Sequence, residues 1–465
     1  MGSGRQYSSR KPAIYKKLEI VKTKLGNVPE SHYAGARLQG IIQQNRSSQL
    51  VGVYAVCSAH PDVIAAAARE VHENDSVLHV ESTSSQVNQF GGYTGQVPEQ
   101  FAAFVHAAAR NAGLAKHRVL LGGDHLGPFP WRREPAAFAM DKAHGLVRSC
   151  VLAGYQKIHL DASMACGDDP KTGLDEKTVA TRSAALCETA EKAFRDLPPT
   201  APPLFYVVGT EVPAPGGESG PEESVSVTTA EHVRSALDAF KRAFVERRLA
   251  DAWERVIGLV VQPGVEFGDT NVFDYERRKA KALSAALPAS PQLAYEAHST
   301  DYQLASSLKQ MVEDHFVILK VGPELTFAFR EAVFALSEIE RDMLAGKPAP
   351  VSKVREVLES AMLRSPSYWR DYYHGDEHQL RISRFYSYSD RCRYYWHDLE
   401  VKAEISRLIE NLTALSPPLT LISQFLPIEY DAIRAGRFPA SPSELIANHI
   451  RTVLHKYAKA CGEAT

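Results

Sequence analysis

Short and nearly continuous hydrophobic runs recur eight times along the chain, and segments of helical period lie between most of them. Each run is too short for a buried helix and is rich in β-branched residues, so it predicts a strand that is buried on both faces. The eight runs cover residues 50–57, 76–81, 118–123, 157–163, 204–211, 256–264, 292–298 and 316–322.

The intervening segments have the apolar spacing of amphipathic helices. Examples are residues 60–73, 98–113 and 139–154, and the segment 229–248 begins at Thr228-Thr229 with Glu231 in its first turn, a good helix start. Eight successive strand–helix units predict an α/β protein with a closed (β/α)8 TIM barrel. An open doubly wound sheet is the alternative, but no GxGxxG follows the first strand and no P-loop occurs.

The pattern changes after the segment GKPAP at residues 346–350. We therefore expect an N-terminal extension over 1–35, the barrel over 36–346, and an appended C-terminal helical region over 347–465. This last region is rich in aromatic residues, above all between positions 365 and 396, which suits a lid or a subunit contact.

Composition excludes several classes of protein. The formal net charge is -2, which gives no reason to expect binding to nucleic acid. No apolar run approaches the roughly 20 residues that span a bilayer, and the N-terminus lacks the apolar core of a signal peptide. The six cysteines are scattered, without metal-binding spacing, and we expect free thiols in a cytoplasmic protein.

Polar residues stand at the carboxyl ends of the predicted strands, where barrels of this type form their active sites. We expect these residues to meet at one rim: Glu81, Asp124, His125, His159, Asp161, Glu211, Gln262, Glu296, His298 and Lys320. Imidazoles and carboxylates together suit a divalent cation such as Zn, Mn, Mg, Ni or Co. Such a cation would polarise a carbonyl while Asp124, and with it Asp161 or Glu211, transfers protons.

Other residues are candidates for binding a substrate. The polar loop 82–95 suits sugar hydroxyls, and the proposed substrate-binding set comprises Glu81, Asn88, Gln89, Gln262, Ser299, Lys320, Arg391 and Arg393. Several have simpler interpretations. Lys320 fits a Schiff base or an ion pair inside the barrel equally well. Arg391 and Arg393 are more typical of interface or solvated residues than of a phosphate site. His159 is interpreted as a core residue. For His60 a structural role and a functional role are equally compatible with the sequence.

Several long motifs resemble one family. CSAHPDVI, NQFGGYTG, LGGDHLGPFPW, KIHLDASM, GTEVPAPGG, QPGVEF, YEAHSTDYQ and YSYSDRCRYYW resemble the non-catalytic subunit family of D-tagatose-bisphosphate aldolase, from about residue 35 onward. Some members of this family are identified as tagatose-6-phosphate kinases, and some act as D-tagatose 6-phosphate 4-epimerases. No nucleotide-binding loop or kinase signature supports the kinase assignment here.

The family is similar, at a distance, to class II zinc-dependent ketose-bisphosphate aldolases. That resemblance implies that Asp124 transfers a proton and that His125 and His298 bind the metal. The third metal histidine of those aldolases corresponds to Gln262, a poor zinc ligand, so Glu211 or Asp161 is expected to complete a more oxygen-rich site. The segment KVGPELTF also differs from the aldolases' substrate segment.

The resemblance and the strand-end residues together favour a metal-dependent ketose-phosphate 4-epimerase that works by retro-aldol cleavage and recondensation. The alternative is a non-catalytic subunit that stabilises a class II D-tagatose-1,6-bisphosphate aldolase. A sugar-phosphate binding protein without turnover is a third, weaker interpretation. Partners compatible with these interpretations are a small phosphorylated sugar, a class II aldolase subunit and a second copy of the chain.

Overall fold

The computed structural model describes residues 33–74, 76–212 and 225–463. Residues 1–32 of the expected N-terminal extension, and the PAPGG stretch of one motif, lie outside the described residues. Within the described part, eight parallel strands close into a barrel in the order β1-β10-β9-β6-β5-β4-β3-β2, so the predicted fold class is confirmed. The strands are β1 (Val53–Val56), β2 (Leu78–Thr83), β3 (Val119–Leu126), β4 (Lys157–Leu160), β5 (Phe205–Val208), β6 (Val256–Val261), β9 (Ala294–Ala297) and β10 (Phe316–Val321).

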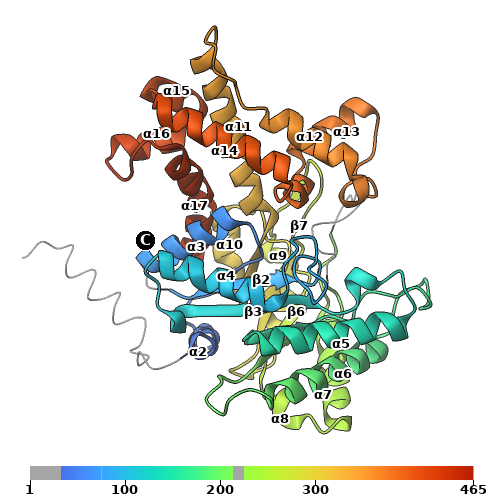
Figure 1. Ribbon diagram of the computed structural model, residues 1–465. Coiled ribbons are helices and arrows are strands. Elements are labelled where there is room, and N and C mark those ends of the chain that lie inside the picture. The colour runs from blue at the N-terminus through green and yellow to red at the C-terminus, as the bar shows by residue number, and fades with distance from the viewer. Residues whose placement is uncertain (1–32, 75, 213–224, 464–465) are drawn as a thin grey trace, which may run out of the picture.

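Helices surround the barrel, and their apolar faces pack against the strands (Figure 1). They are α3 (Pro61–Asn74), α4 (Pro98–Asn111), α5 (Ala136–Leu152), α6 (Glu176–Phe194), α7 (Ala230–Glu246), α8 (Ala250–Trp253), α9 (Arg277–Ala286), α10 (Ala305–Glu313) and α11 (Pro323–Leu344). The expected start of α7 is confirmed, because the Thr229 side chain accepts a hydrogen bond from the His232 backbone N–H. A short hairpin of β7 (Glu266–Phe267) and β8 (Val272–Phe273) follows β6.

The amino end of the barrel is filled by apolar side chains and covered by α2 (Ala34–Arg46). Ala34, Leu38 and Ile42 of this helix form one buried cluster with strand residues. The strand residues include Val53, Leu120, Phe205, Ile257, Ala294 and Ile318. The polar residues of the strands therefore gather towards the opposite, carboxyl end.

Four charged side chains occupy the middle of the barrel, and none is more than 3% exposed. The Lys157 ammonium lies 2.7 Å from Glu81 Oε1 and 2.7 Å from Glu296 Oε2. Lys320 pairs with Glu81 as well and lies 3.6 Å from Glu296 Oε1. Burial alone would raise the pKa of the Glu81 carboxyl, but the two ammonium groups outweigh that effect and lower it. The sequence-based alternative of an ion pair for Lys320 is therefore realised in the structure.

The C-terminal region consists of helices that pack on one side of the barrel (Figure 1). They are α12 (Val354–Arg364), α13 (Glu377–Tyr386), α14 (Leu399–Leu415), α15 (Leu419–Phe425), α16 (Pro427–Arg434) and α17 (Pro442–Ala460), with 3-10 turns η3 (Pro366–Tyr368) and η4 (Arg391–Tyr395). Helix α17 returns to pack against α3, α10 and α11. Its end is also tied to the barrel, because the Gly52 N–H donates to the Cys461 carbonyl oxygen.

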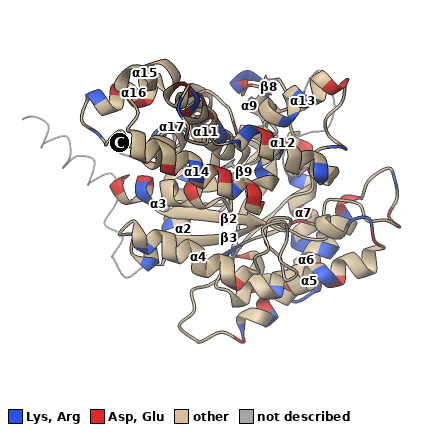
Figure 2. Ribbon diagram, turned by 45° about the horizontal axis from the view of Figure 1, so that its top comes forward, with Lys and Arg blue, Asp and Glu red and all other residues tan. Residues whose placement is uncertain are grey.

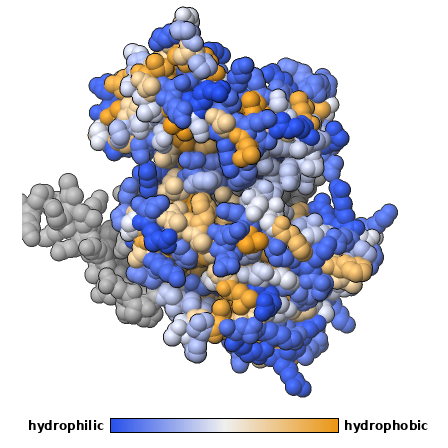
Figure 3. Space-filling view, in the orientation of Figure 1, coloured by the Kyte–Doolittle hydropathy of each residue, from blue (hydrophilic) through white to orange (hydrophobic). Residues whose placement is uncertain are grey.

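The outer surface is mixed in character. Basic and acidic residues are interspersed over the helices in Figure 2, in keeping with a net charge near zero. In Figure 3 apolar side chains form small groups within a mostly hydrophilic face. No helix among the described residues is long and apolar enough to cross a bilayer. All six cysteines are free, and five of them are buried.

A half-buried histidine ties α17 to two other helices. His449 Nδ1 lies 2.9 Å from Glu429 Oε1 on α16, and its Nε2 lies 3.3 Å from Glu331 Oε2 on α11. Burial alone would lower the pKa of His449, but these two hydrogen bonds outweigh it and raise the pKa to about 9. The charged form of this side chain is therefore favoured in the folded chain.

This histidine predicts a pH-dependent stability. The folded pKa lies above that of an unfolded chain, so the stabilisation is fully present below a pH of about 6.5 and is lost as the pH rises through about 9. We expect His449→Gln to lower the free energy of unfolding by about 2 kcal/mol at pH 6, allowing for the exposure of Glu331, and by little at pH 10. Urea denaturation at both pH values measures this, and an equal loss at both would contradict it.

Candidate active site at the carboxyl end of the barrel

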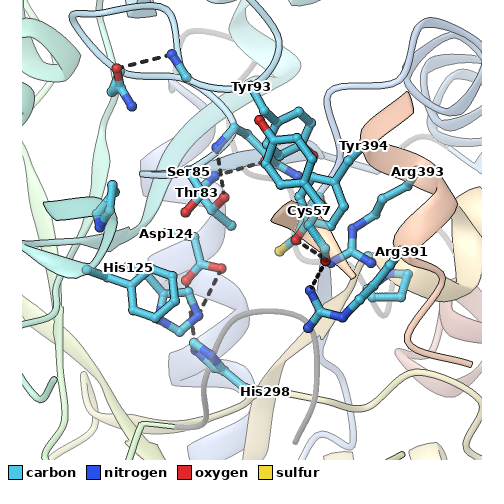
Figure 4. A pocket seen from close by; sticks show the side chains of 18 of the residues that line it. Cys57, Thr83, Ser85, Tyr93, Asp124, His125, His298, Arg391, Arg393 and Tyr394 are labelled. Carbon is cyan, nitrogen blue, oxygen red and sulfur yellow. Dashed lines mark hydrogen bonds and ion pairs between the residues drawn. The ribbon is translucent and has the colours of Figure 1, made fainter. Parts of the chain in front are cut away.

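A cavity of about 520 Å³ opens at the carboxyl end of the barrel. Strand ends and the loops after them form its floor, and η3 and η4 of the C-terminal region form its opposite wall. Figure 4 shows Asp124, His125 and His298 on one side of this cavity, with Arg391, Arg393 and Tyr394 on the other. Its size falls in the usual range for a small-molecule site.

Three imidazoles converge at this end of the barrel, and two of them, His125 and His298, line the cavity. The ring centroid of His125 lies 4.9 Å from that of His298 and 5.2 Å from that of His159, and the last two rings are 5.2 Å apart. His125 lies near the end of β3, His159 lies within β4 and His298 follows β9, so the closure of the barrel brings them together. All three side chains are at most 4% exposed.

Asp124 lies at the centre of this group. Its Oδ1 is 3.0 Å from His159 Nδ1 and 2.9 Å from the Lys320 ammonium, whereas its Oδ2 is 3.7 Å from His125 Nε2. Burial alone would raise the pKa of Asp124, but the neighbouring His125 and Lys320 hold it well below its usual range. This carboxylate is therefore ionised, with Oδ2 outside hydrogen-bond distance of His125 Nε2.

Asp161 positions one of the imidazoles. Its Oδ2 lies 2.8 Å from His125 Nδ1, and its Oδ1 accepts hydrogen bonds from the Ser163 N–H and hydroxyl. His125 itself has a φ of 48°, a left-handed conformation that is costly for a residue with a Cβ. A carboxylate on Nδ1 fixes the ring and directs Nε2 to the opposite side, which is the usual arrangement behind a metal-binding histidine.

The donor set fits a divalent cation. Ligand atoms of Asp124, His159, Glu296 and His298 all lie within 4.8 Å of one another. Both neighbours of the His159 ring, Asp124 Oδ1 and the His125 backbone N–H, are at Nδ1, which donates to the carboxylate in one tautomer or accepts from the N–H in the other. His159 Nε2 is buried and has no hydrogen-bond partner among the described residues. A buried nitrogen without a partner is unusual unless an ion or water satisfies it.

Glu211 does not join this group. Strand β5 ends at Val208, so the chain has already left the barrel three residues before Glu211. The carboxylate lines a separate depression with Gln262 and lies 3.6 Å from His232 Nε2. The Gln262 side chain is also committed, because its Oε1 accepts the backbone N–H groups of Gly264 and Val265.

The substrate-binding candidates divide into two sets. Those that line the cavity are Asn88, Ser299, Lys320, Arg391 and Arg393. The Asn88 amide is used by its own loop, since it accepts from Phe90 N–H and Gly92 N–H and donates to the Ser84 carbonyl. Glu81 lies in the buried charge cluster below, and Gln89 donates to the Lys142 carbonyl away from the cavity.

His60 packs on Phe329, with ring centroids 4.1 Å apart, and is not among the cavity-lining residues.

Sequence reasoning missed part of the floor and most of the opposite wall. His159 was interpreted as core, and Glu296 was left without a role. The missed signal is the alternation of side chains along a strand. Lys157, His159 and Asp161 follow one another at intervals of two residues, so their side chains leave the same face of the strand. Three tyrosines of the wall, Tyr93, Tyr368 and Tyr394, come from segments that no local pattern places together.

Gly127 holds the site's backbone in place. A Cβ at this position would lie 1.5 Å from the Asp161 carbonyl oxygen, so the loops after β3 and β4 would have to separate. We expect Gly127→Ala to cost about 3 kcal/mol of folding free energy and to disturb the His125–Asp161 contact. Chemical denaturation measures the loss.

Gly40→Ala is the matched control for that substitution, because Gly40 lies within α2 and no atom comes within 4 Å of the added carbon. Alanine is favoured over glycine in a helix by about 0.5–1 kcal/mol, so this variant should be as stable as the parent or more so. Equal stabilities for the two variants would show that the contact at Gly127 is easily relaxed.

This chain is similar to several known proteins. A family model described as D-tagatose-1,6-bisphosphate aldolase subunit GatZ/KbaZ-like matches residues 38–462. The crystal structure of a probable tagatose 6 phosphate kinase from Sinorhizobium meliloti 1021 is 40% identical, with a TM-score of 0.80, and the match covers 88% of this chain and all of that one. The fructose-bisphosphate aldolase of Campylobacter jejuni matches at 14% identity and a TM-score of 0.41, over 83% of this chain and 96% of its own. The family match over most of the sequence shows that the chain belongs to the GatZ/KbaZ-like family of D-tagatose-1,6-bisphosphate aldolase subunits.

Proposed function

We propose that this chain is a metal-dependent ketose-phosphate 4-epimerase that interconverts D-tagatose 6-phosphate and D-fructose 6-phosphate by retro-aldol cleavage and recondensation. The observation that carries the proposal is the convergence of three imidazoles around the ionised Asp124: His125 and His298 line the cavity, and the ring of the fully buried His159 lies 5.2 Å from each of theirs. Membership of a family of D-tagatose-1,6-bisphosphate aldolase subunits supports a tagatose phosphate as the substrate. Epimerisation uses the same bond cleavage as an aldolase, without release of the fragments.

His125, His159 and His298 are the residues that would hold the cation. His159 and His298 belong to the group of ligand atoms within 4.8 Å of one another, and the His125 ring, outside that group, lies 4.9 Å from the His298 ring and 5.2 Å from the His159 ring. Asp124, which also belongs to the group, is assigned to proton transfer instead. Two of the three histidines, His125 and His298, were expected from the sequence, and His159 takes the place that was expected for Glu211 or Asp161. The bound cation would supply Lewis acidity at the C2 carbonyl and stabilise the negative charge that develops there. The buried Nε2 of His159 and the orientation of His125 by Asp161 both support this assignment.

Asp124 is the proposed proton acceptor. Its Oδ2 takes the proton of the C4 hydroxyl, the C3–C4 bond breaks, and the electron pair of that bond passes into an enediolate at C2 and C3. The C4 carbon becomes an aldehyde in the departing fragment. The aldehyde turns, the C3–C4 bond forms again on its other face, and Asp124 returns the proton to the C4 oxygen. Atoms and charge balance without a further reactant.

The surroundings suit an intermediate that water would destroy by protonation. The Lys320 ammonium, 2.9 Å from Asp124 Oδ1, offsets the charge of the carboxylate and fixes its orientation. Tyr93, Tyr368 and Tyr394 pack edge-to-face and stacked above the cavity, with the Tyr368 and Tyr394 rings 4.7 Å apart. An aromatic wall of this kind limits the entry of water.

Incubation of the purified chain with D-tagatose 6-phosphate and single divalent metals tests the proposal. We expect D-fructose 6-phosphate to form. We expect EDTA to remove about 90% of the activity or more, and we expect the activity to recover when the metal is added back. His298→Ala should lose both the bound metal, measured by elemental analysis, and turnover. Full activity in EDTA would contradict the metal-dependent mechanism.

The second candidate function is a non-catalytic subunit that stabilises a class II D-tagatose-1,6-bisphosphate aldolase. The position of Lys320 favours it, because this ammonium already neutralises the carboxylates of Asp124 and Glu296. Under this proposal the chain alone forms no product with any metal, whereas a class II aldolase copurifies with it and survives heating longer in its presence.

A further inference from the structure

A barrel of this type often binds phosphate near its eighth strand, at the amino end of a nearby helix. In this chain the helix that follows the eighth strand is α11, and an internal carboxylate already occupies its amino end. Asp301 Oδ1 accepts the backbone N–H groups of Gly322 and Glu324, each at 2.9 Å. Glu324 adds a second carboxylate, paired with Lys456. An anionic ligand would therefore meet two acidic groups there instead of free N–H donors.

The opposite wall of the cavity offers a different anion site at Arg391. This side chain lines the cavity and is only 2% exposed. Its Nη1 donates to the Tyr368 carbonyl at 2.9 Å, and its guanidinium carbon lies 3.0 Å from the centroid of the Tyr372 ring. These contacts fix the plane of the guanidinium group without using its remaining donors.

Two nitrogens of Arg391, Nε and Nη2, are buried and have no hydrogen-bond partner in the described part of the chain. They form one edge of the guanidinium group, the edge that binds two oxygens of a phosphate or carboxylate side by side. Leaving such donors buried and unpaired is costly for a folded protein. The cost is understandable if a ligand satisfies them.

The neighbouring Arg393 is not equivalent. Its Nη1 donates to the carbonyl oxygens of Ser389 and Asp390, and its Nη2 donates to the Tyr394 hydroxyl at 2.9 Å. Burial alone would raise the pKa of Tyr394, but the guanidinium groups of Arg393 and Arg391 lower it overall. Arg393 therefore holds its turn and adds positive charge. Arg391 also interacts with the Tyr394 hydroxyl, but its Nε and Nη2 make no hydrogen bond of normal geometry within the described residues.

The two other arginines that line the cavity lie at its rim. Arg133 pairs with Asp371 where both side chains are largely exposed, and Arg132 packs over the Phe129 ring, 4.5 Å from its centroid. Exposed guanidinium groups bind anions weakly because water and salt compete with them. Among the described residues, Arg391 is the cavity-lining arginine that combines burial with unused donors.

We infer that Arg391 binds the phosphate group of a sugar monophosphate through Nε and Nη2, and so sets the substrate class of the cavity. The identity of the sugar rests on the proposed function, whereas the anion site rests on Arg391 itself. The phosphate then lies against the wall formed by η4, across the cavity from His125 and His298 (Figure 4). This arrangement points the carbonyl end of the sugar towards Asp124.

Calorimetric titration of the full chain with inorganic phosphate, and separately with D-tagatose 6-phosphate, tests the inference. We expect Arg391→Met to weaken binding of both by about tenfold or more. Arg370→Met is the matched control, since Arg370 is exposed in the same region and does not line the cavity, and its affinities should equal those of the parent. Unphosphorylated D-tagatose, titrated into parent and Arg391→Met, should show a much smaller change.

Arg391→Lys is a second variant that distinguishes loss of the anion site from a folding defect. It keeps the positive charge and loses only the two adjacent donors, Nε and Nη2. We expect it to weaken phosphate binding by about threefold or more, with an unchanged thermal midpoint. Phosphate affinities equal to the parent in both variants would overturn the inference, even if epimerisation is found. Conversely, loss of phosphate binding in a chain without epimerase activity would support the anion site and contradict the proposed reaction.

Discussion

Asp124→Asn is expected to lower kcat for epimerisation by about 10³-fold while the chain remains folded. The asparagine side chain has the same shape but cannot take the C4 proton. Its oxygen still lies close to the Lys320 ammonium, and the three imidazoles are untouched. Conversion of D-tagatose 6-phosphate to D-fructose 6-phosphate, followed by a coupled assay, gives the rate, and circular dichroism checks the fold.

Metal content separates two causes of that loss. If Asp124 transfers the proton, Asp124→Asn retains its metal and loses turnover, whereas His298→Ala loses both. Asp175→Asn is the control: Asp175 is the N-cap of α6, and asparagine caps a helix about as well as aspartate. An Asp124→Asn variant that keeps more than about a tenth of the parental rate would rule out Asp124 as the general base.

Lys157→Met is expected to destabilise the fold by about 3–5 kcal/mol, the usual cost of leaving buried charges without their partner. Lys157 joins Glu81 and Glu296 across the centre of the barrel, each at 2.7 Å, and all three side chains are fully buried. Methionine fills a similar volume but leaves both carboxylates in an apolar interior, with Lys320 as the remaining counter-ion. Urea denaturation of parent and variant gives the difference in free energy of unfolding.

A surface pair provides the comparison. Lys142 lies 2.6 Å from Glu134 Oε1, but both side chains are about one-third exposed, so Lys142→Met should cost less than about 1 kcal/mol. In the double variant Lys157→Met with Glu81→Gln, the removal of one unpaired charge should recover part of the loss. If Lys157→Met is no more destabilising than Lys142→Met, water or an ion reaches the barrel centre and screens the charges.

The barrel was predictable because its strands are buried on both faces. Such strands consist of continuous apolar runs, and all eight runs became strands of one closed sheet. Their ends were less predictable. Residues 204–211 form one run in the sequence, but pairing stops at Val208, where the polar residues leave the sheet. Only the register between neighbouring strands, which the sequence does not display, sets that end point.

The site was partly predictable for the same reason. Asp124, His125 and His298 stand where strands end, and the structure places them together. His159 lies inside the strand, so it resembled a core residue in the sequence. The missed indication was that His159 and Asp161 are two residues apart and therefore lie on the same face of the strand. Glu211 was placed at the rim on the assumption that β5 extends to it. Arg391 follows the barrel by many residues, and only tertiary packing brings it to the cavity.

Under the proposed function, the groups that select the substrate and the groups that break the bond lie in different parts of the chain. The imidazoles and Asp124 belong to the barrel, whereas Arg391, Tyr368 and Tyr394 belong to the segment 365–396, which follows the barrel in the sequence. Exchange of that segment would therefore alter which sugars enter the cavity and leave the bond-breaking groups in place. Directed evolution towards new ketoses should accordingly find its productive changes between residues 365 and 396, and it should tolerate few at the strand ends.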